Sequence, residues 1–366
     1  MMKKEQKADW LLTCCIVILV VIGVLMVYSA SSIWASYRFN DHFYFAKRQL
    51  LFATVGLAAM QGVSRIPYHS WRRYAKPILL SCFILLAMVL IPGVGLVRGG
   101  ARSWIGIGAF SIQPAEFIKL ALLIFLADVI SDRQKLITHF FKGFAPLLLL
   151  VMFCFGLIML QPDLGTGVVL VAACLTLLFA AGAQIKHFVF LAFIGISGFA
   201  GLIISAPYRI DRITAFINPW EDPLGNGFQI IQSLYAIGPG GLFGNGFGQS
   251  LQKYFYLPEP HNDFIFAIIA EELGFIGATG VLIIFSLLLW RGVRIALGAP
   301  DKFGALLAIG IVAMISLQVA INISVVIGLI PVTGITLPFL SYGGSSLTLT
   351  LASMGIVLNI SRHCYY

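Results

Sequence analysis

The chain has few charged side chains. Only 11% of its 366 residues are Asp, Glu, Lys or Arg, whereas 59% are hydrophobic and the mean hydropathy is +0.95. A water-soluble domain carries about 25% charged residues, so this composition excludes a soluble enzyme or binding domain of this length. The sequence therefore predicts a polytopic membrane protein.

The cysteine patterns of disulfide frameworks and metal sites are also missing. The six cysteines lie within apolar runs or at the end of the last one, and none of them has CxxC spacing. Their positions predict neither a disulfide framework nor a metal site. We find no internal repeat, low-complexity tract or polar second domain, and no small-x-small cleavage site follows the first apolar run, which we interpret as a retained helix. Residues 1–366 are predicted to form a single polytopic membrane domain.

Apolar runs long enough to cross a bilayer, about 20 residues each, recur along the chain. They lie near residues 11–30, 46–63, 77–95, 113–131, 144–161, 164–182, 187–205, 264–290, 304–330 and 342–361. The predicted fold is therefore an all-α bundle of about ten transmembrane helices. The break at "LQPDLGTG" either divides two spans or kinks one, and the length between Phe144 and Gly182 favours two.

The placement of basic residues predicts the orientation of the bundle. With the N-terminus in the cytoplasm, 15 of the 24 Lys and Arg residues fall in inner segments and 8 in outer segments, and Lys119 lies within a span. This bias agrees with the retention of basic flanks in the cytoplasm. The N- and C-termini of this multi-pass protein are accordingly predicted to be cytoplasmic.

One connection, residues 206–262, is too long for a simple connector and is predicted to be an extracellular loop with a function. Its segments "FQIIQSLYAI" and "LQKYFYLPEP" are amphipathic enough to lie on the membrane surface or to pack over the bundle. Its glycine-rich stretch "GPGGLFGNGFGQS" predicts sharp turns and a backbone that can approach a ligand closely. Without a phosphate-binding motif, we interpret this region as a re-entrant cover over an outer cavity.

Eight motifs, in order along the chain, resemble the SEDS family (shape, elongation, division and sporulation), and its sporulation members most. These are "KRQL", "RSWIGIG", "QPAEFIKLA", "QPDLGT", "NPWEDPLGNGFQIIQSL", "GPGGLFGNGFGQS", "PEPHNDFIFAIIAEELG" and "PFLSYGGSS". The resemblance implies a peptidoglycan glycosyltransferase of the bacterial cytoplasmic membrane. It would polymerise lipid II into glycan strands for spore cortex or septal wall, beside a class B penicillin-binding protein that crosslinks them.

The resemblance assigns the essential carboxylate to Asp263. A sugar on a lipid pyrophosphate already has a good leaving group, so one general base suffices where glycoside hydrolysis uses two carboxylates. By residue type alone, a helix-capping Asp is the commoner case. Glu271 and Glu272 lie about 12–14 Å further along the same helix and are predicted to be buried in a polar network whose basic partners the sequence does not identify. His261 is a second candidate base, although a loop His of this kind is more often solvated.

Cations on the outer side are candidate ligands of the substrate pyrophosphate, because the Arg guanidinium binds phosphate with two hydrogen bonds. The resemblance supports Arg48 most, and Arg209 and Arg212 less, while anchoring to lipid headgroups is an equal alternative for each. Trp104 either anchors the chain at the membrane interface or contacts the substrate. We favour substrate contact, because its aromatic face suits a sugar ring and the resemblance implies that a Trp at this position matters for activity. A divalent cation, Mg²⁺ or Mn²⁺, is a possible cofactor.

The remaining polar residues have structural alternatives. Glu116 and Lys119 are spaced i, i+3 within a span, and we interpret them as an ion pair that supports the structure. Asp163 and Ser341 are predicted to line the cavity, with a kinked interface of small residues as the rival interpretation.

Two other functions fit parts of the sequence. A lipid II flippase would also need outward cavities and charges within the membrane, but the inner loops lack a cluster comparable to the outer one. A non-catalytic scaffold for the transpeptidase would leave Asp263 without a role. The transferase accounts for more residues than either.

Overall fold

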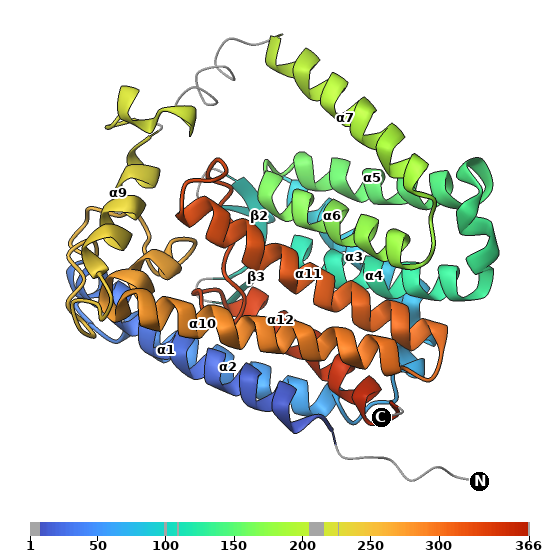
Figure 1. Cartoon of the computed structure of the whole chain (residues 1–366), viewed down its shortest axis with the longest axis horizontal. Helices are drawn as coiled ribbons and strands as arrows, with labels where there is room; N and C mark the ends of the chain where they lie inside the picture. Colours follow the sequence, from blue (N-terminus) through green and yellow to red (C-terminus); the bar gives the residue numbers. More distant parts are fainter. Residues whose placement is uncertain (1–7, 99–100, 108–109, 205–215, 226, 365–366) are drawn as a thin grey trace.

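The computed structural model describes residues 8–98, 101–107, 110–204, 216–225 and 227–364, and these are mostly helical (Figure 1). Each predicted span overlaps one helix. These are α1 (Trp10–Phe39), α2 (Tyr44–Val63), α3 (His69–Leu90), α4 (Pro114–Arg133), α5 (Ala145–Met159), α6 (Leu164–Ala180), α7 (Ile185–Ile204), α10 (Ile265–Gly298), α11 (Lys302–Val326) and α12 (Gly344–Ser361). Within the described part of the chain, 6 helical segments are long and apolar enough to cross a membrane: α1, α3, α5 with the π-helical turn before it (η2, Phe140–Phe144), α10, α11 and α12. The prediction of a multi-pass helical bundle is confirmed.

Short polar side chains begin several of these helices. The Asp9 carboxylate accepts a hydrogen bond from Leu12 N at 2.9 Å at the start of α1, and Asp301 accepts one from Gly304 N at 2.7 Å at the start of α11. Such caps satisfy amide groups that have no partner within the helix. The sequence therefore specifies where the apolar segments begin as well as their length.

Helix α12 packs closely along α2 through glycines. A Cβ at Gly56 would lie 2.5 Å from Leu351 Cδ1, and a Cβ at Gly355 would lie 2.5 Å from Met60 O. Small residues at such positions let two helices approach where lipid provides no hydrophobic driving force. This pair of helices brings the segment before α12 next to the start of α2.

The two ends of the bundle are called here the Asp263 end and the Arg72 end. Helix α10 begins at the Asp263 end, beside the loop that precedes it, and α3 begins at the Arg72 end (Figure 1). The first and last described elements also meet at the Arg72 end, where Asp9 N donates to Ser361 Oγ at 3.1 Å and Arg291 Nε lies 2.5 Å from Asp9 Oδ2. Because the helices alternate in direction, the connections fall into two separate groups.

A small antiparallel sheet at the Asp263 end was not predicted. Its strands are β1 (Gly95–Arg98), β2 (Ala101–Ile107) and β3 (Phe110–Ile112), in the order β1-β2-β3. The predicted span over residues 77–95 ends already at Leu90, because Pro92 keeps the preceding residue extended. The strands are too short for their alternation to stand out beside the long apolar runs.

The predicted loop 206–262 is partly helical. Residues 205–215 and 226 are outside the described part of the chain, and the remainder contains η3 (Pro219–Glu221), α9 (Phe228–Ile237) and η4 (Gly238–Gly240). Helix α9 buries Ile230 and Ile231, and Ser233 Oγ donates to Val326 O of α11 at 2.7 Å. Of the two predicted positions for this amphipathic segment, it takes the one packed over the bundle.

Candidate functional site

Helix α10 is broken at Gly274, about two and a half turns after its start. Gly274 has φ +66° and ψ −169°, which an L-residue with a side chain rarely adopts. The backbone groups freed by the break pair with the glycine-rich segment 238–250, which donates from Asn245 N to Glu271 O at 3.0 Å and accepts at Gly241 O from Phe275 N at 2.8 Å. The break thus converts part of a transmembrane helix into an attachment point for the outer loop.

The glycines of this segment are needed for close approach to α10. A Cβ at Gly244 would lie 2.1 Å from Glu272 O, and a Cβ at Gly240 would lie 2.2 Å from Ala270 O. Gly244 also has a positive φ of +78°. The predicted close backbone approach is therefore present, but at these positions it is made to the protein itself and not to a ligand.

Glu271 and Glu272 hold the next part of the loop. The Glu272 carboxylate accepts from Ser29 Oγ at 2.6 Å, from Gly248 N at 3.0 Å and from Ser250 N at 3.1 Å. The Glu271 carboxylate accepts from Ser250 Oγ at 2.5 Å and from Leu251 N at 2.7 Å. Both glutamates are 1% exposed. A buried carboxylate is tolerated when its oxygens are satisfied in this way.

The basic partner that the sequence analysis did not identify is Lys253. Its Nζ lies 3.5 Å from Glu272 Oε1, and it also donates to Gly248 O. Lys253 itself is 5% exposed although it belongs to the loop. No spacing rule joins a loop lysine to a glutamate on the following helix, so only the fold shows the pair.

Asp263 lies just before α10 and its backbone is fixed by α11. Asn322 Nδ2 donates to Asp263 O at 2.6 Å and to Ile335 O at 2.7 Å. Asn322 is fully buried. One amide therefore joins α11, the start of α10 and the loop that precedes α12, and it holds the Asp263 backbone in one place.

The Asp263 carboxyl is an unusually weak acid for an aspartate. Burial raises its pKa to about 7, and the charge of the nearby Glu259 adds to the rise, while a hydrogen bond from its own backbone amide acts in the opposite direction. A carboxyl with a pKa near neutral pH is deprotonated often enough to accept a proton and basic enough to hold it. Perturbed groups of this kind concentrate at functional sites.

His261 is buried, which corrects the expectation of a solvated loop histidine. It is 3% exposed, and its ring lies among those of Phe45 at 4.4 Å, Tyr342 at 5.7 Å and Trp34 at 6.1 Å, measured between centroids. Burial lowers the pKa of its imidazole to about 4. His261 is therefore neutral at pH 7 and a weaker base than Asp263.

The loop before α12 joins the predicted site residues of two other elements. Gln49 Nε2 of α2 donates to Ser341 O at 3.0 Å, and Tyr342 N donates to His261 O at 2.9 Å. Ser341 Oγ accepts from Leu337 N at 2.7 Å, so the hydroxyl stabilises the loop's own turn. Ser341 thus belongs to the same hydrogen-bonded assembly as His261 and Gln49, the residue after Arg48.

Several buried polar atoms near this assembly have no hydrogen-bond partner within the part of the chain that the structure describes. They are Gln49 Oε1, His261 Nδ1, Asn322 Oδ1, Thr333 Oγ1 and Ser345 Oγ. Buried polar groups in native proteins are normally paired with protein, water or ligand. These atoms, which sequence reasoning did not single out, make the Asp263 end a place that can receive a polar molecule.

Arg48 is half-buried and stacks on an aromatic ring. Its guanidinium carbon lies 4.0 Å from the centroid of Tyr44. Among the described residues no carboxylate pairs with it, so its hydrogen-bond donors can serve an anion. Arg209 and Arg212, the other two predicted anion ligands, lie outside the described residues.

Trp104 comes from a different part of the Asp263 end. It stands on β2 opposite Leu96 of β1 and is half-buried, and β2 packs on α3 and α4. Hydrogen bonds from Asn322, Tyr342 and Gln49 therefore link the Asp263 segment, the loop that contains Ser341 and the Arg48 segment. Trp104 lies on a separate element.

Asp163 is the N-cap of α6. Its Oδ1 accepts from Thr166 N at 3.1 Å and its Oδ2 accepts from Gln113 Nε2 at 2.7 Å. A Cβ at Gly165 would lie 2.5 Å from Thr333 O. These contacts favour the rival interpretation, a close-packed interface of small residues, over a cavity-lining role for Asp163.

Glu116 and Lys119 form the predicted ion pair inside α4. Lys119 Nζ lies 2.8 Å from Glu116 Oε1, and the two side chains are 2% and 9% exposed respectively. The pair neutralises both charges at a depth where either alone would be costly.

The described residues do not fit a metal cage. No three His, Cys, Asp or Glu side chains come together as ion ligands in the ranges that the structure describes. A divalent cation near Asp263 would find Glu259 as its neighbouring carboxylate, and that is too few protein ligands for a dedicated site.

Comparison with known proteins agrees with the motifs. The FtsW/RodA/SpoVE family model, described as cell cycle protein, matches residues 9–366. Stage V sporulation protein E of Bacillus subtilis (strain 168) is 63% identical over 366 residues, 100% of both chains. A probable peptidoglycan glycosyltransferase FtsW of Trichlorobacter lovleyi is 46% identical over 353 residues, which cover 96% of this chain and 93% of that protein.

Two solved structures share the fold. A chain from a study titled "Structural coordination of polymerization and crosslinking by a peptidoglycan synthase complex" superposes with a TM-score of 0.82 at 33% identity, and 98% of both chains are covered. The rod shape determining protein RodA of Thermus thermophilus superposes with a TM-score of 0.73 at 30% identity, again over 98% of both chains.

Proposed function

The chain belongs to the FtsW/RodA/SpoVE family of cell cycle proteins, and from this premise we propose that it is a peptidoglycan glycosyltransferase that polymerises lipid II. The observation that carries the proposal is Asp263. Its carboxyl has a pKa of about 7, and its backbone is held by Asn322 among buried polar atoms that have no hydrogen-bond partner among the described residues. Two relatives that match nearly the whole of this chain bear names that state sporulation and peptidoglycan glycosyl transfer.

The reaction needs one base. Asp263 accepts the proton of the acceptor sugar hydroxyl, and the resulting oxygen attacks the anomeric carbon of the donor sugar. The bond from that carbon to the pyrophosphate oxygen breaks as the new glycosidic bond forms, and the lipid pyrophosphate departs with the electron pair. Because pyrophosphate is a stable leaving group, no second carboxyl is needed to protonate it.

Arg48 is the described residue best suited to bind the pyrophosphate. It lies near the start of α2 and directly precedes Gln49, whose side chain donates to Ser341 O in the hydrogen-bonded assembly. Its planar guanidinium donates to two phosphate oxygens at once, and the Tyr44 ring orients it. Arg209 and Arg212 are proposed as further ligands, and the ring of Trp104 as a platform for a sugar.

The orientation and partner follow from this role. Lipid II is polymerised on the outer face of the cytoplasmic membrane, so the Asp263 end faces outward and both termini are cytoplasmic, in agreement with the basic residues at the Arg72 end. The partner is proposed to be a class B penicillin-binding protein that crosslinks the strands. A similar chain belongs to a peptidoglycan synthase complex that coordinates polymerisation with crosslinking. The high identity to a sporulation protein supports a role in spore cortex or septal wall.

The test is polymerisation of labelled lipid II by the purified protein in detergent, with and without the class B partner. Asp263→Asn keeps the size of the side chain but removes its basicity, so we expect the rate to fall by about 10²- to 10⁴-fold. Asp41→Asn is the matched control, because Asp41 lies in a loop at the same end and pairs with Lys47 at 2.9 Å.

The same proteins in liposomes separate the alternatives. If wild type makes no strands even with the partner while lipid II crosses the bilayer, the protein is a flippase. If Asp263→Asn polymerises at the wild-type rate, a catalytic role for this residue is wrong, and a scaffold that activates its partner becomes the better account.

A further inference from the structure

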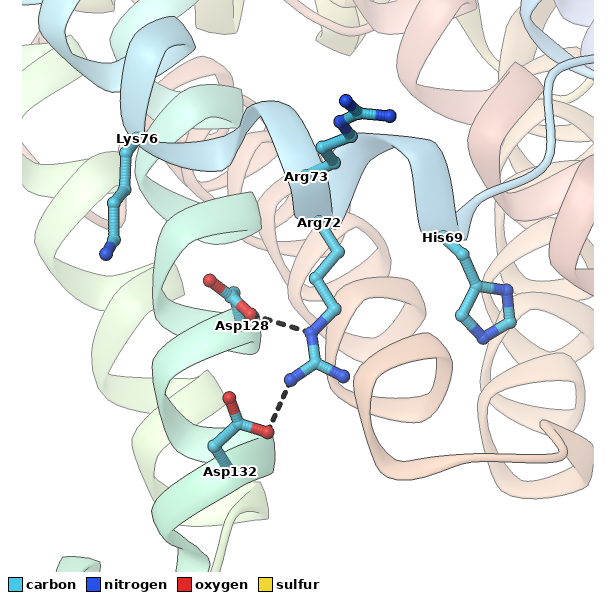
Figure 2. Close-up of a pocket in the computed structure, with 6 residues that line it drawn as sticks. All are labelled: His69, Arg72, Arg73, Lys76, Asp128 and Asp132. Carbon is cyan, nitrogen blue, oxygen red and sulfur yellow. Dashed lines mark hydrogen bonds and ion pairs between the residues drawn. The ribbon is translucent and has the colours of Figure 1, made fainter.

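A cavity at the Arg72 end has no part in the proposed reaction. It encloses about 460 Å³ between the first turns of α3 and the last turns of α4 and is lined by His69, Arg72, Arg73, Lys76, Asp128 and Asp132 (Figure 2). The four basic or titratable side chains are spaced i, i+3, i+4 and i+7 on α3, which places them on one helix face. The cavity therefore brings several hydrogen-bond donors together at the start of a transmembrane helix.

The two carboxylates of the cavity are occupied by one arginine. Arg72 Nε donates to Asp128 Oδ1 at 2.8 Å, and Arg72 Nη2 donates to Asp132 Oδ1, as the dashed lines in Figure 2 show. His69 Nε2 pairs instead with Asp301 Oδ2 at 2.6 Å. The carboxylates here are thus already paired: Asp128 and Asp132 with Arg72, and Asp301 with His69.

The other two cations of the cavity, Arg73 and Lys76, take no part in these ion pairs. Both side chains are exposed, and no carboxylate among the described residues pairs with either. A neighbouring cavity of about 350 Å³, lined by Arg133, Lys135 and Lys302 among others, adds more positive charge. Six cations against Asp128, Asp132 and Asp301 leave this surface with an excess of positive charge, which attracts anions.

The part of α3 that follows Lys76 presents exposed apolar side chains. Leu80 is 62% exposed and Ile84 is 55% exposed, at i+4 and i+8 from Lys76, so the three side chains follow one stripe of α3. Helix α3 is itself long and apolar enough to cross the membrane. An anion with hydrocarbon chains would therefore meet cations at its head and apolar side chains along its tails.

We propose that this cavity is a binding site for an acidic phospholipid, whose phosphodiester headgroup is held by Arg73 and Lys76 and whose acyl chains lie along Leu80 and Ile84. Basic pockets at the ends of transmembrane helices select anionic headgroups in this way. Arg72 is the positioning residue, because its bridge to Asp128 and Asp132 keeps those carboxylates from capturing the two free cations. The site lies at the opposite end of the bundle from Asp263 and does not depend on the proposed reaction.

The experiment measures the binding of phosphatidylglycerol and of phosphatidylcholine to the detergent-solubilised full chain, by native mass spectrometry and by the lipid-dependent shift of the melting temperature. Wild type is expected to bind phosphatidylglycerol more tightly than phosphatidylcholine. Arg73→Gln/Lys76→Gln should weaken phosphatidylglycerol binding by about thirtyfold, the equivalent of about 2 kcal/mol for two cations. Arg65→Gln/Lys142→Gln removes the same charge from exposed positions outside the cavity and should change binding less than about threefold.

Three results would overturn the proposal. Equal binding of the two lipids would remove the headgroup selectivity, and an equal loss in both double variants would indicate a general surface charge. Inorganic phosphate that competes at the same concentration as phosphatidylglycerol would identify a soluble anion as the ligand, because a lipid held partly by Leu80 and Ile84 binds more tightly than its phosphate alone. The melting temperature without lipid checks that each variant is folded.

Discussion

Glu272 and Arg72 each bind two or more partners, but they lie at opposite ends of the bundle and differ in their exposure to solvent. Glu272 is 1% exposed, accepts hydrogen bonds from Ser29 and two loop amides, and forms an ion pair with Lys253. The Arg72 side chain is 38% exposed, and its partner Asp132 is 62% exposed. Water can replace a lost partner at the Arg72 end, whereas at the Asp263 end only the protein or a ligand can.

This difference in solvent exposure distinguishes the proposed catalytic site at the Asp263 end from the proposed lipid site at the Arg72 end. Burial raises the pKa of Asp263 and keeps polar atoms unpaired beside it, and the surrounding loops are held by hydrogen bonds to α10 and α11. The cavity around Arg72 keeps most of its charged side chains exposed to solvent, where ion pairs contribute little to stability and cations remain available to anions. We expect substitutions to be costly at the first end and mild at the second.

The largest loss of stability is expected for Glu272→Gln. Removal of this charge leaves the buried Lys253 without its carboxylate partner, and breaking a buried ion pair costs about 3 kcal/mol. Thermal unfolding in detergent measures the loss, and Glu259→Gln is the control because Glu259 is exposed in the same loop. Glu272→Gln/Lys253→Met should recover part of the loss; a double variant no more stable than Glu272→Gln would show that the loop amides, and not Lys253, are what the carboxylate supports.

Activity should depend on pH through Asp263. The deprotonated carboxyl is the base, so the rate is expected to fall about tenfold for each pH unit below about 7. Stability changes in the other direction. Because folding raises the pKa of Asp263, this group favours the folded state most below the unfolded pKa near 4 and loses that contribution as pH rises through about 7.

Glu259 sharpens this prediction, because its charge contributes to the raised pKa. Glu259→Gln should move the midpoint of the pH–rate profile to lower pH, while Asp41→Asn, at the same end of the bundle, should leave it in place. A profile that is flat between pH 5 and 8 would contradict the role of Asp263 as the base. The polymerisation assay over this pH range provides both measurements.

The helices were predictable because each apolar run is about as long as a membrane span, as for α1 and α11. Contacts between distant segments were not. Lys253 meets Glu272 only because Gly274 breaks α10 and the glycine-rich segment pairs with it. The sheet of β1–β3 was missed because its strands are short.

Burial of single polar side chains was the hardest property to predict. His261 appeared solvated beside Pro260, yet Trp34, Phe45 and Tyr342 enclose it, and these come from three separate elements. Asp263 was singled out by the family motif, whereas its partner Asn322 had no local signal, since an amide within an apolar helix has many possible roles. The motif identified the reacting group, and the fold showed what holds it.

The smallest effect is expected for Arg72→Gln. The substitution removes both ion pairs with Asp128 and Asp132, but water can solvate the carboxylates that remain, so the cost in stability should be about 1 kcal/mol or less. Thermal unfolding at low and high salt measures the loss of stability and tests whether exposed ion pairs cause it. Salt at about 1 M screens exposed charges within about 3 Å, so it should remove most of the stability difference from wild type. A loss as large as that of Glu272→Gln, and independent of salt, would mean that the Arg72 end is as closed to water as the Asp263 end, and the contrast between the two would not hold.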